Sequence, residues 1–482
     1  MEKRPFRAIA FVALLLVVTA CSTPTPSAAS PTPGPSAALS TPVAAPSPSS
    51  AASGAGGIAV EKIPLWLSPT VHAVLWRPAS AADRKPVAIV AMHESADFTN
   101  ASSCGELASR GFQMLCANGR FLNQQASIIW DDLMLDMKTA VAYLRTQSDI
   151  KKVFLFGHSG GGALMSYYQN VAENGVKVCQ DPRRIMPCPN ALADLPKADG
   201  VILIDPIPGL AYSGLTATDP AVVNDDQFGR IDPSKIDASL DMFSKANGYD
   251  LKEPRYSADF VKRFHVAQGA RYNELVKLAL SRMDAIKAGK GWFPDDEPFV
   301  VNRANARLWV YDTELIAHTQ KPHTIVTATG QREDIVPSVR PVGVSAAGGT
   351  TDSSKTDPLF TQARNATVRS FLSTFAIRTD NFQITADSIS GVDWESSNTS
   401  LVANVAGIRS PLLALSMTAH YWLVTTELAW TGSPSTDKTL AYIEGATHVF
   451  SPCKPCEKTP GQFGDTNKAL MDYVAKWIST RM

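Results

Sequence analysis

The chain has 482 residues, of which 45 are Lys or Arg, 45 are Asp or Glu, and 45% are hydrophobic. This length suffices for one large hydrophobic core or two ordinary ones, so it does not fix the number of domains. The formal net charge is zero, and no run of like charges stands out. Nucleic acid is therefore disfavoured as a partner, because phosphate binding needs a clustered excess of basic side chains.

Residues 1–21 have the composition of a targeting segment and are left out of the fold. Lys3, Arg4 and Arg7 precede an apolar stretch that is too short to span a bilayer. The segment ends in Val18–Cys21 (VTAC), which resembles a bacterial lipobox. The resemblance implies cleavage before Cys21 and acylation of this cysteine. An ordinary signal peptide with an incidental cysteine is the alternative.

Residues 22–57 consist almost entirely of Ser, Thr, Pro, Ala and Gly and contain eight prolines. Such a segment cannot bury apolar surface, so we expect an extended, solvated tether. A tether that directly follows a lipid anchor indicates an exported protein held on the extracytoplasmic side of a membrane or at the cell surface. Which membrane carries the anchor stays open.

Six further cysteines follow: Cys104, Cys116, Cys179, Cys188, Cys453 and Cys456. An even number in an oxidising compartment indicates disulfides, and closeness in sequence makes 104–116, 179–188 and 453–456 the simplest pairing. The CxxC at 453–456 could instead be redox-active or half of a zinc site. A structural bridge is favoured, since the chain has no second CxxC and no thioredoxin-like βαβ unit around this one.

Beyond the tether, apolar runs alternate with helical patterns, which is typical of a mostly parallel sheet with helices on both faces. The first half predicts strands at 87–92, 112–117, 153–156 and 201–204, and helices at 104–110, 130–144 and 163–174. The alternation then breaks and resumes only with strands at 411–415 and 438–443 and a final helix capped by Asp465.

The long middle region contains a strong helix at 258–288 and little strand signal apart from 324–329. We therefore expect an α/β core formed by residues 58–210 and 406–482, interrupted by a large, mainly helical cap at 211–405. A separate domain of unrelated purpose is the alternative. The cap is favoured because the sheet resumes afterwards with the closing elements that it needs.

A strand, a glycine-rich turn and a helix follow one another at 154–174, with G-x-S-x-G spacing around Ser159. In this spacing the serine stands on a sharp, strained turn, where flanking side chains would collide with the neighbouring strand and helix. The turn exposes the hydroxyl at the carboxyl edge of the sheet, where such sheets bind ligands. This context resembles the nucleophile elbow of the α/β-hydrolase superfamily, and the resemblance covers about 64–482 apart from the insertion. It implies a Ser–His–acid triad and an oxyanion hole.

The superfamily carries its histidine just after the last strand, where Glu444–His448 (EGATH) is similar to the usual G-A-x-H ending. His448 would therefore take the proton from Ser159. The resemblance also implies that the backbone N–H of Gly160 and one N–H after the first buried strand form the oxyanion hole. We assign the second donor to Ser95, with Glu94 as the alternative, although relatives usually carry His-Gly here.

The acid of the triad usually follows the strand at 411–415, but residues 416–420 (SMTAH) contain no carboxylate. Asp205 instead ends the strand at 201–204, as in members resembling platelet-activating-factor acetylhydrolase. Asp334 lies in a G-x-x-D-x-x-V-P-like stretch, far before His448 in the chain, and Glu427 follows the usual strand on an expected helix. We predict Asp205, because the triad needs a buried carboxylate at the carboxyl edge of the sheet.

These features together predict a serine hydrolase of the esterase, lipase or dienelactone-hydrolase kind, which needs no cofactor or metal. Its substrate would be a small or lipid-like ester, and its oligomeric state stays open. A peptidase or amidase with the same nucleophile is one alternative, and a non-catalytic binding lipoprotein is another. Aromatic residues of the cap suggest a partly apolar substrate, although such residues more often serve packing: Trp292, Phe293, Phe299 and Trp309.

Overall fold

The computed structural model describes residues 52–53, 57–223, 235–250, 252–342 and 363–482. The targeting segment, Cys21 and nearly all of the expected tether lie outside these described residues. Among the residues described, none of the helices combines the length and apolar character needed to traverse a bilayer.

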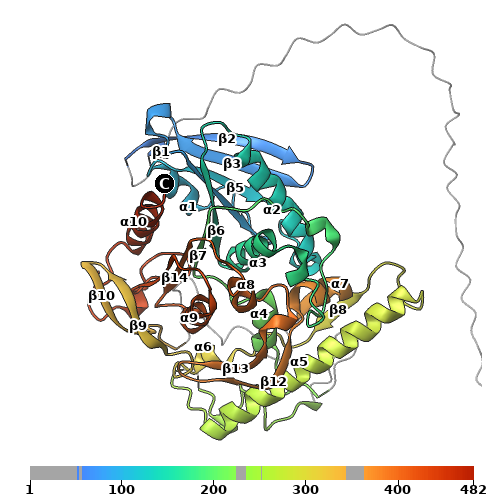
Figure 1. The fold of residues 1–482 in the computed structure, drawn as a ribbon. Helices are drawn as coiled ribbons and strands as arrows, with labels where there is room; N and C mark the ends of the chain where they lie inside the picture. The colour runs from blue at the N-terminus through green and yellow to red at the C-terminus, as the bar shows by residue number, and fades with distance from the viewer. Residues whose placement is uncertain (1–51, 54–56, 224–234, 251, 343–362) are drawn as a thin grey trace, which may run out of the picture. The chain divides into compact units, whose positions relative to one another are not determined.

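The described strands include an eleven-stranded sheet in the order β1-β2-β3-β5-β4-β6-β7-β14-β15-β9-β10 (Figure 1). Every neighbouring pair from β5 to β9 in this order is parallel, and the remaining pairs are antiparallel. The strands are β1 (Ala52–Ser53), β2 (Ala59–Ser68), β3 (Val71–Pro78), β4 (Val87–His93), β5 (Gln113–Asn118), β6 (Lys152–His158), β7 (Gly200–Ile204), β9 (His318–Thr327), β10 (Gly330–Pro337), β14 (Leu412–Met417) and β15 (Lys438–Ile443). The expected mostly parallel sheet is confirmed.

Helices cover both faces of this sheet. Alternate residues of β4 point to opposite sides, so Ile89 packs in the cluster of α1 and α10, while Val90 packs in the cluster of α2, α3 and α8. Burial on both faces explains why the strands read as continuous apolar runs. The helices are α1 (Ser102–Ala108), α2 (Trp130–Arg145), α3 (Gly160–Asn174), α8 (Leu401–Val405) and α10 (Thr466–Ser479).

The ends of two helices follow the expected capping chemistry. The Asp465 side chain accepts a hydrogen bond from the backbone N–H of Lys468 at 2.9 Å, which caps α10. Helix α3 ends at Gly175, whose φ of 76° suits a residue without a Cβ. These local signals place both helices correctly from the sequence.

The segment expected as a cap has its own hydrophobic core, which continues onto the outer strands of the sheet. Its longest element is α5, as predicted, which begins after Ser257 with a side-chain cap on the N–H of Phe260. Two short antiparallel sheets, β8–β11 and β12–β13, accompany the helices. The elements are α4 (Leu210–Ala217), α5 (Ala258–Lys287), β8 (Pro298–Val301), α6 (Leu308–Tyr311), β11 (Arg364–Thr367), α7 (Val368–Ser370), β12 (Arg378–Ile384) and β13 (Ile389–Asp393), and α9 (Leu423–Gly432) follows β14.

The hairpin β9–β10 changes the expected division of the chain. It lies within residues 211–405, yet β9 pairs in parallel with β15, so that Tyr442 is opposite Ile325. The hairpin thereby covers the edge of β15, which would otherwise present unpaired backbone groups. The region expected as one mainly helical insertion therefore contributes two strands to the main sheet.

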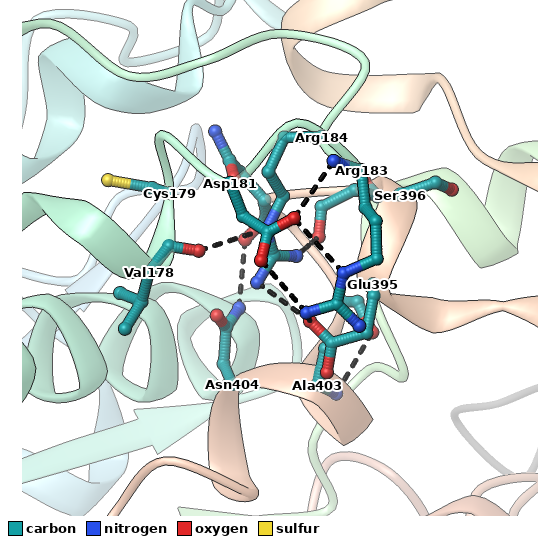
Figure 2. Close-up of polar contacts among 12 residues, drawn as sticks. Val178, Cys179, Asp181, Arg183, Arg184, Glu395, Ser396, Ala403 and Asn404 are labelled. Atoms are coloured by element: carbon teal, nitrogen blue, oxygen red, sulfur yellow. Dashed lines mark hydrogen bonds and ion pairs between the residues drawn. The ribbon is translucent and has the colours of Figure 1, made fainter.

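A polar cluster fastens the segment that returns from the insertion to the core (Figure 2). The buried Arg184 donates to the carbonyl oxygen of Ser397 at 2.8 Å and forms an ion pair with Glu395 at 3.1 Å. Arg183 pairs with Asp181 at 2.9 Å in the same loop. These contacts fix residues 395–397 shortly before α8 and β14, and so help to position the return to the sheet.

Cysteine sulfur atoms lie at bonding distance in the pairs 104–116, 179–188 and 453–456, which is the simplest pairing expected from the sequence. Cys104 to Cys116 joins α1 to β5, and Cys179 to Cys188 closes the loop that carries Arg184. Cys453 and Cys456 form a bridge in the loop after β15, so the two cysteines of the CxxC motif are paired with each other.

Candidate active site

Ser159 stands between β6 and α3 with φ 57° and ψ −125°, a conformation that is strained for a residue with a side chain. Glycines flank Ser159 because neighbouring backbone segments approach this turn too closely to leave room for side chains. A Cβ on Gly157 would lie 2.4 Å from the carbonyl oxygen of Gly161, and a Cβ on Gly161 would lie 2.5 Å from that of Met92. The G-x-S-x-G spacing is therefore a packing requirement of this turn.

The structure brings Ser159, His448 and Asp205 together from three separate loops. Ser159 Oγ lies 2.9 Å from His448 Nε2, and His448 Nδ1 lies 2.6 Å from Asp205 Oδ2. An ionised carboxylate only accepts hydrogen bonds, so Nδ1 carries the proton and Nε2 is free to accept that of the serine hydroxyl. This arrangement can deprotonate the serine as it attacks an electrophile.

Further contacts fix the positions of Ser159 and His448 relative to each other. His158 Nε2 lies 2.8 Å from the carbonyl oxygen of His448, and the two rings are 4.6 Å apart. Burial, followed by repulsion from His448, holds the pKa of His158 well below its usual value, so its neutral ring can donate this bond. The backbone N–H of Ile207 donates to the carbonyl oxygen of Ser159 at 2.9 Å, which ties the elbow to the loop after β7.

Asp205 is fully buried at the end of β7 and has a φ of 43°. Its Oδ1 accepts hydrogen bonds from the hydroxyl of Ser416 at 3.0 Å and the backbone N–H of Met417 at 3.3 Å. Burial raises the pKa of Asp205, but His420 and His448 outweigh this and hold it below its ordinary value. The carboxylate therefore stays ionised beside the two imidazoles.

His420 is the residue that the sequence analysis missed. Its Nδ1 lies 2.5 Å from Asp205 Oδ2, and its ring stacks on that of His448 with centroids 4.3 Å apart and 25° between the planes. Burial lowers the pKa of His420 to about 4, against the attraction of Asp205, so the ring is neutral near pH 7. This histidine ends the stretch 416–420, but an argument that looks there only for a carboxylate does not identify it.

The cluster of Asp205, His420 and His448 also has the residue types of a metal site, with its ligand atoms within 4.8 Å of one another. However, the two Nδ1 atoms are 2.5 and 2.6 Å from the same carboxylate oxygen. These are hydrogen-bond distances, whereas two ligands of one cation stand about 3 Å or more apart, given metal–ligand bonds of about 2 Å. The geometry fits shared protons better than a shared ion.

The other two candidate acids lie in different surroundings. Asp334 is exposed on the edge strand β10, where it pairs with Arg332 at 3.1 Å. Glu427, on α9, accepts the N–H groups of Gln320 and Lys321 and lies 2.8 Å from His323 Nε2. Glu427 thus fastens α9 to the start of β9, and neither carboxylate has a contact with His448 among the described residues.

The two expected oxyanion donors differ in their availability. Gly160 is the first residue of α3, and no described residue accepts a bond from its N–H. The N–H of Ser95, in contrast, lies 3.3 Å from His93 Nδ1 within its own loop. The Glu94 carboxylate is buried beside Gly160, since a Cβ there would lie 1.9 Å from Glu94 Oε2. The assignment of Ser95 stays a prediction, and it requires the bond to His93 to open.

The strand order from β2 to β15, together with a serine on a tight turn between β6 and α3, identifies the fold. This is the α/β-hydrolase fold. No family model and no curated protein matches the sequence of this chain. Solved structures similar to it include siderophore hydrolase EstB from Aspergillus fumigatus, with 12% identity, a TM-score of 0.42, and coverage of 87% of this chain and 97% of that chain.

Two further similar structures are Est1E from Butyrivibrio proteoclasticus and a soluble variant of monoglyceride lipase from Saccharomyces cerevisiae. Est1E is 10% identical with a TM-score of 0.37, and the match covers 87% of this chain and 98% of Est1E. The lipase is 10% identical with a TM-score of 0.39, and the match covers 87% of this chain and 95% of the lipase. Likeness at this level carries no information about the substrate of this chain.

Proposed function

We propose that the protein is a serine hydrolase that cleaves carboxylic esters through an acyl-enzyme. The observation that supports this proposal is the unbroken series of hydrogen-bond distances from Ser159 Oγ through the His448 ring to Asp205 Oδ2, at 2.9 and 2.6 Å. The serine is the nucleophile, the histidine is the general base and then the general acid, and the carboxylate orients and stabilises the imidazolium.

In the first half of the reaction, Ser159 Oγ bonds to the ester carbonyl carbon while His448 Nε2 takes the hydroxyl proton. The negative charge on the carbonyl oxygen is stabilised by the N–H of Gly160. The intermediate collapses as the carbon–oxygen bond to the alcohol portion breaks, and the leaving oxygen takes the proton from His448. In the second half, water gives a proton to His448 and attacks the acyl carbon. Ser159 then leaves and regains its proton, and the acid product is released.

Labelling with a fluorophosphonate probe tests the nucleophile directly. The wild-type protein is expected to be labelled and the Ser159→Ala variant is not, with Ser103→Ala as a control for a serine in α1. Labelling of Ser159→Ala would contradict the proposal, and a wild-type protein that is not labelled would favour a binding protein. Paired assays of 4-nitrophenyl esters and amino-acid anilides separate an esterase from a peptidase, since faster anilide hydrolysis would overturn the ester assignment.

We further propose that this hydrolase acts outside the cytoplasm, anchored through lipid on Cys21. The support is the sequence of the first 57 residues alone, namely a lipobox-like VTAC followed by a proline-rich tether. Metabolic labelling with an alkyne fatty acid in a bacterial host should tag the wild-type chain but not Cys21→Ala. Equal labelling of both chains would refute the anchor without affecting the proposed chemistry.

A further inference from the structure

Two of the four aromatic residues singled out in the insertion do not pack inside it. Phe299 and Trp309 are buried in the hydrophobic core of the insertion. Trp292 is 46% exposed and Phe293 is 54% exposed, and both lie in the loop between α5 and β8 (Figure 1). We call these two residues the aromatic tip. In the described part of the chain they are the only exposed large hydrophobic residues that adjoin in sequence. Single exposed apolar side chains are common, whereas an adjoining pair indicates a contact surface.

Contacts beneath the loop hold the aromatic tip in its exposed position. The buried Glu297 accepts hydrogen bonds from the backbone N–H of Trp292 at 2.5 Å and from Arg282 Nε at 2.8 Å. The Arg282 guanidinium also lies 4.1 Å from the centre of the Trp292 ring. A Cβ on Gly291 would lie 2.8 Å from Glu297 Oε1, so this approach requires a glycine. A loop that is already ordered loses little conformational entropy when its exposed side chains are bound.

The chain around the aromatic tip is exposed and carries two lysines. Every residue from 287 to 295 apart from Gly291 is exposed, and Lys287 and Lys290 precede the tip, while Asp295 follows it. Tryptophan favours the boundary between lipid and water, because it combines a large apolar ring system with one N–H donor. Lysine side chains can reach the lipid phosphates while apolar neighbours enter the boundary of the acyl chains. The chemistry of this loop therefore suits the surface of a bilayer.

The size of the aromatic tip favours lipid over a protein partner. A specific protein interface buries about 800 Å² and about 20–30 residues on each side. The tip offers two large apolar side chains, and the exposed residues beside them are glycine, alanine, proline or charged. Insertion into a lipid interface needs buried apolar area but no complementary shape. The proposed anchor at Cys21 would also keep a bilayer within reach, since a tether of residues 22–57 spans up to about 120 Å when extended.

We propose that Trp292 and Phe293 insert into the interface of the bilayer that carries the anchor, with Lys287 and Lys290 close to the lipid phosphates. This surface goes beyond ester hydrolysis and does not depend on it, whereas the choice of a bilayer as the partner rests on the proposed anchor. The contact would hold one side of the insertion against the membrane. A flexible tether alone leaves the orientation of the enzyme free.

The test measures binding to vesicles of phosphatidylcholine and phosphatidylglycerol by co-sedimentation. It uses a chain that begins at residue 48, because the described residues belong to one compact unit, Pro48–Met482, which does not include Cys21. The unsubstituted chain should bind, and a Trp292→Ala/Phe293→Ala variant should bind at least about tenfold more weakly, as the lost burial of two aromatic side chains implies. Phe293→Ala alone retains the contact between Trp292 and Arg282 and should weaken binding about threefold or more. Trp66→Ala is the matched control, since it removes a tryptophan on β2 that is 76% exposed, and it should leave binding unchanged.

The two lysines make a separate prediction about the lipid. Lys287→Gln/Lys290→Gln should weaken binding to the anionic vesicles about tenfold and leave binding to phosphatidylcholine vesicles unchanged. Equal losses on both kinds of vesicle would refute the placement of the lysines at the phosphates.

Several results would overturn the proposal. These are an unsubstituted chain that does not bind vesicles, or equal binding by this chain and the Trp292→Ala/Phe293→Ala variant. A dimer in analytical ultracentrifugation that this double substitution dissociates, with vesicle binding unchanged, would assign the aromatic tip to a second copy of the chain. Absence of fatty-acid labelling at Cys21 would refute the anchor, and loss of esterase activity would bear on the chemistry, but neither result changes what the vesicles measure.

Discussion

Replacing Asp205 with Asn gives the sharpest test of the proposed triad, because it keeps the shape of the side chain and removes its charge. In the wild type, Oδ2 faces Nδ1 of His448 at 2.6 Å and Nδ1 of His420 at 2.5 Å. If the amide nitrogen of Asn takes this position, it must donate to His448 Nδ1. The proton of His448 then moves to Nε2, which can no longer accept that of Ser159.

The opposite orientation of the amide is also unfavourable. The amide nitrogen would then take the place of Oδ1, where the backbone N–H of Met417 points at it from 3.3 Å, so two donors would face each other. Both orientations also lose the negative charge that stabilises the imidazolium. A loss of about 10⁴ in kcat is expected, equivalent to about 5 kcal/mol of transition-state stabilisation.

The assay is the steady-state hydrolysis of 4-nitrophenyl butyrate, normalised to the folded fraction by thermal unfolding. The other two carboxylates serve as matched controls. Asp334→Asn changes an exposed side chain and should alter kcat less than about twofold. Glu427→Gln should lower Tm, because it weakens bonds to Gln320, Lys321 and His323, but should leave kcat nearly unchanged. An Asp205→Asn enzyme with kcat within tenfold of wild type would refute the assignment, as would a large loss in Asp334→Asn.

Three other predictions follow from the same region and from the insertion. His420→Ala removes the imidazole whose Nδ1 faces the charged Asp205 and should lower kcat about tenfold with a shifted pH profile. His420→Asn keeps a polar N–H group at this position and should recover most of the rate, and equal rates for both variants would leave only a packing role. Gly160→Ala should abolish fluorophosphonate labelling, because its Cβ would meet Glu94 Oε2 at 1.9 Å. Adding Glu94→Ala to this variant should partly restore labelling, and a double variant that is still not labelled would show that the collision is not the cause. Burial lowers the pKa of His265 to about 3, below its unfolded value, so the unfolded state binds more protons and stability falls as pH drops from about 6.5 towards 3. His265→Phe should remove about 3 kcal/mol of the stability difference between pH 7 and pH 4 in urea unfolding, and an unchanged difference would refute this.

The parallel core could be predicted from the sequence because each strand is buried on both faces. A strand such as residues 87–92 is apolar on both faces and therefore forms a continuous hydrophobic run in the sequence. The capped helices between the strands are long enough to identify by the helical spacing of their apolar residues. The β9–β10 hairpin could not be recognised in this way. Residues 318–323 of β9 (HTQKPH) are mostly polar, and only its last part shows an apolar signal, so its role at the edge of the sheet depends on pairing with β15.

The position of the acid follows from the register of two neighbouring parallel strands. Ile204 of β7 is paired with Leu415 of β14, so Asp205 and Ser416 are side by side at the carboxyl edge, joined by a 3.0 Å hydrogen bond. A carboxylate at either strand end can therefore reach the histidine that follows β15. Placing the acid on β7 leaves the loop after β14 free, and in this chain that loop carries His420 to the other side of the same carboxylate. The absence of an acid at 416–420 is therefore compatible with the proposed triad, whose acid follows β7 instead of β14. If Asp205 and His420 act together, the effects of Asp205→Asn and His420→Ala on kcat should not add.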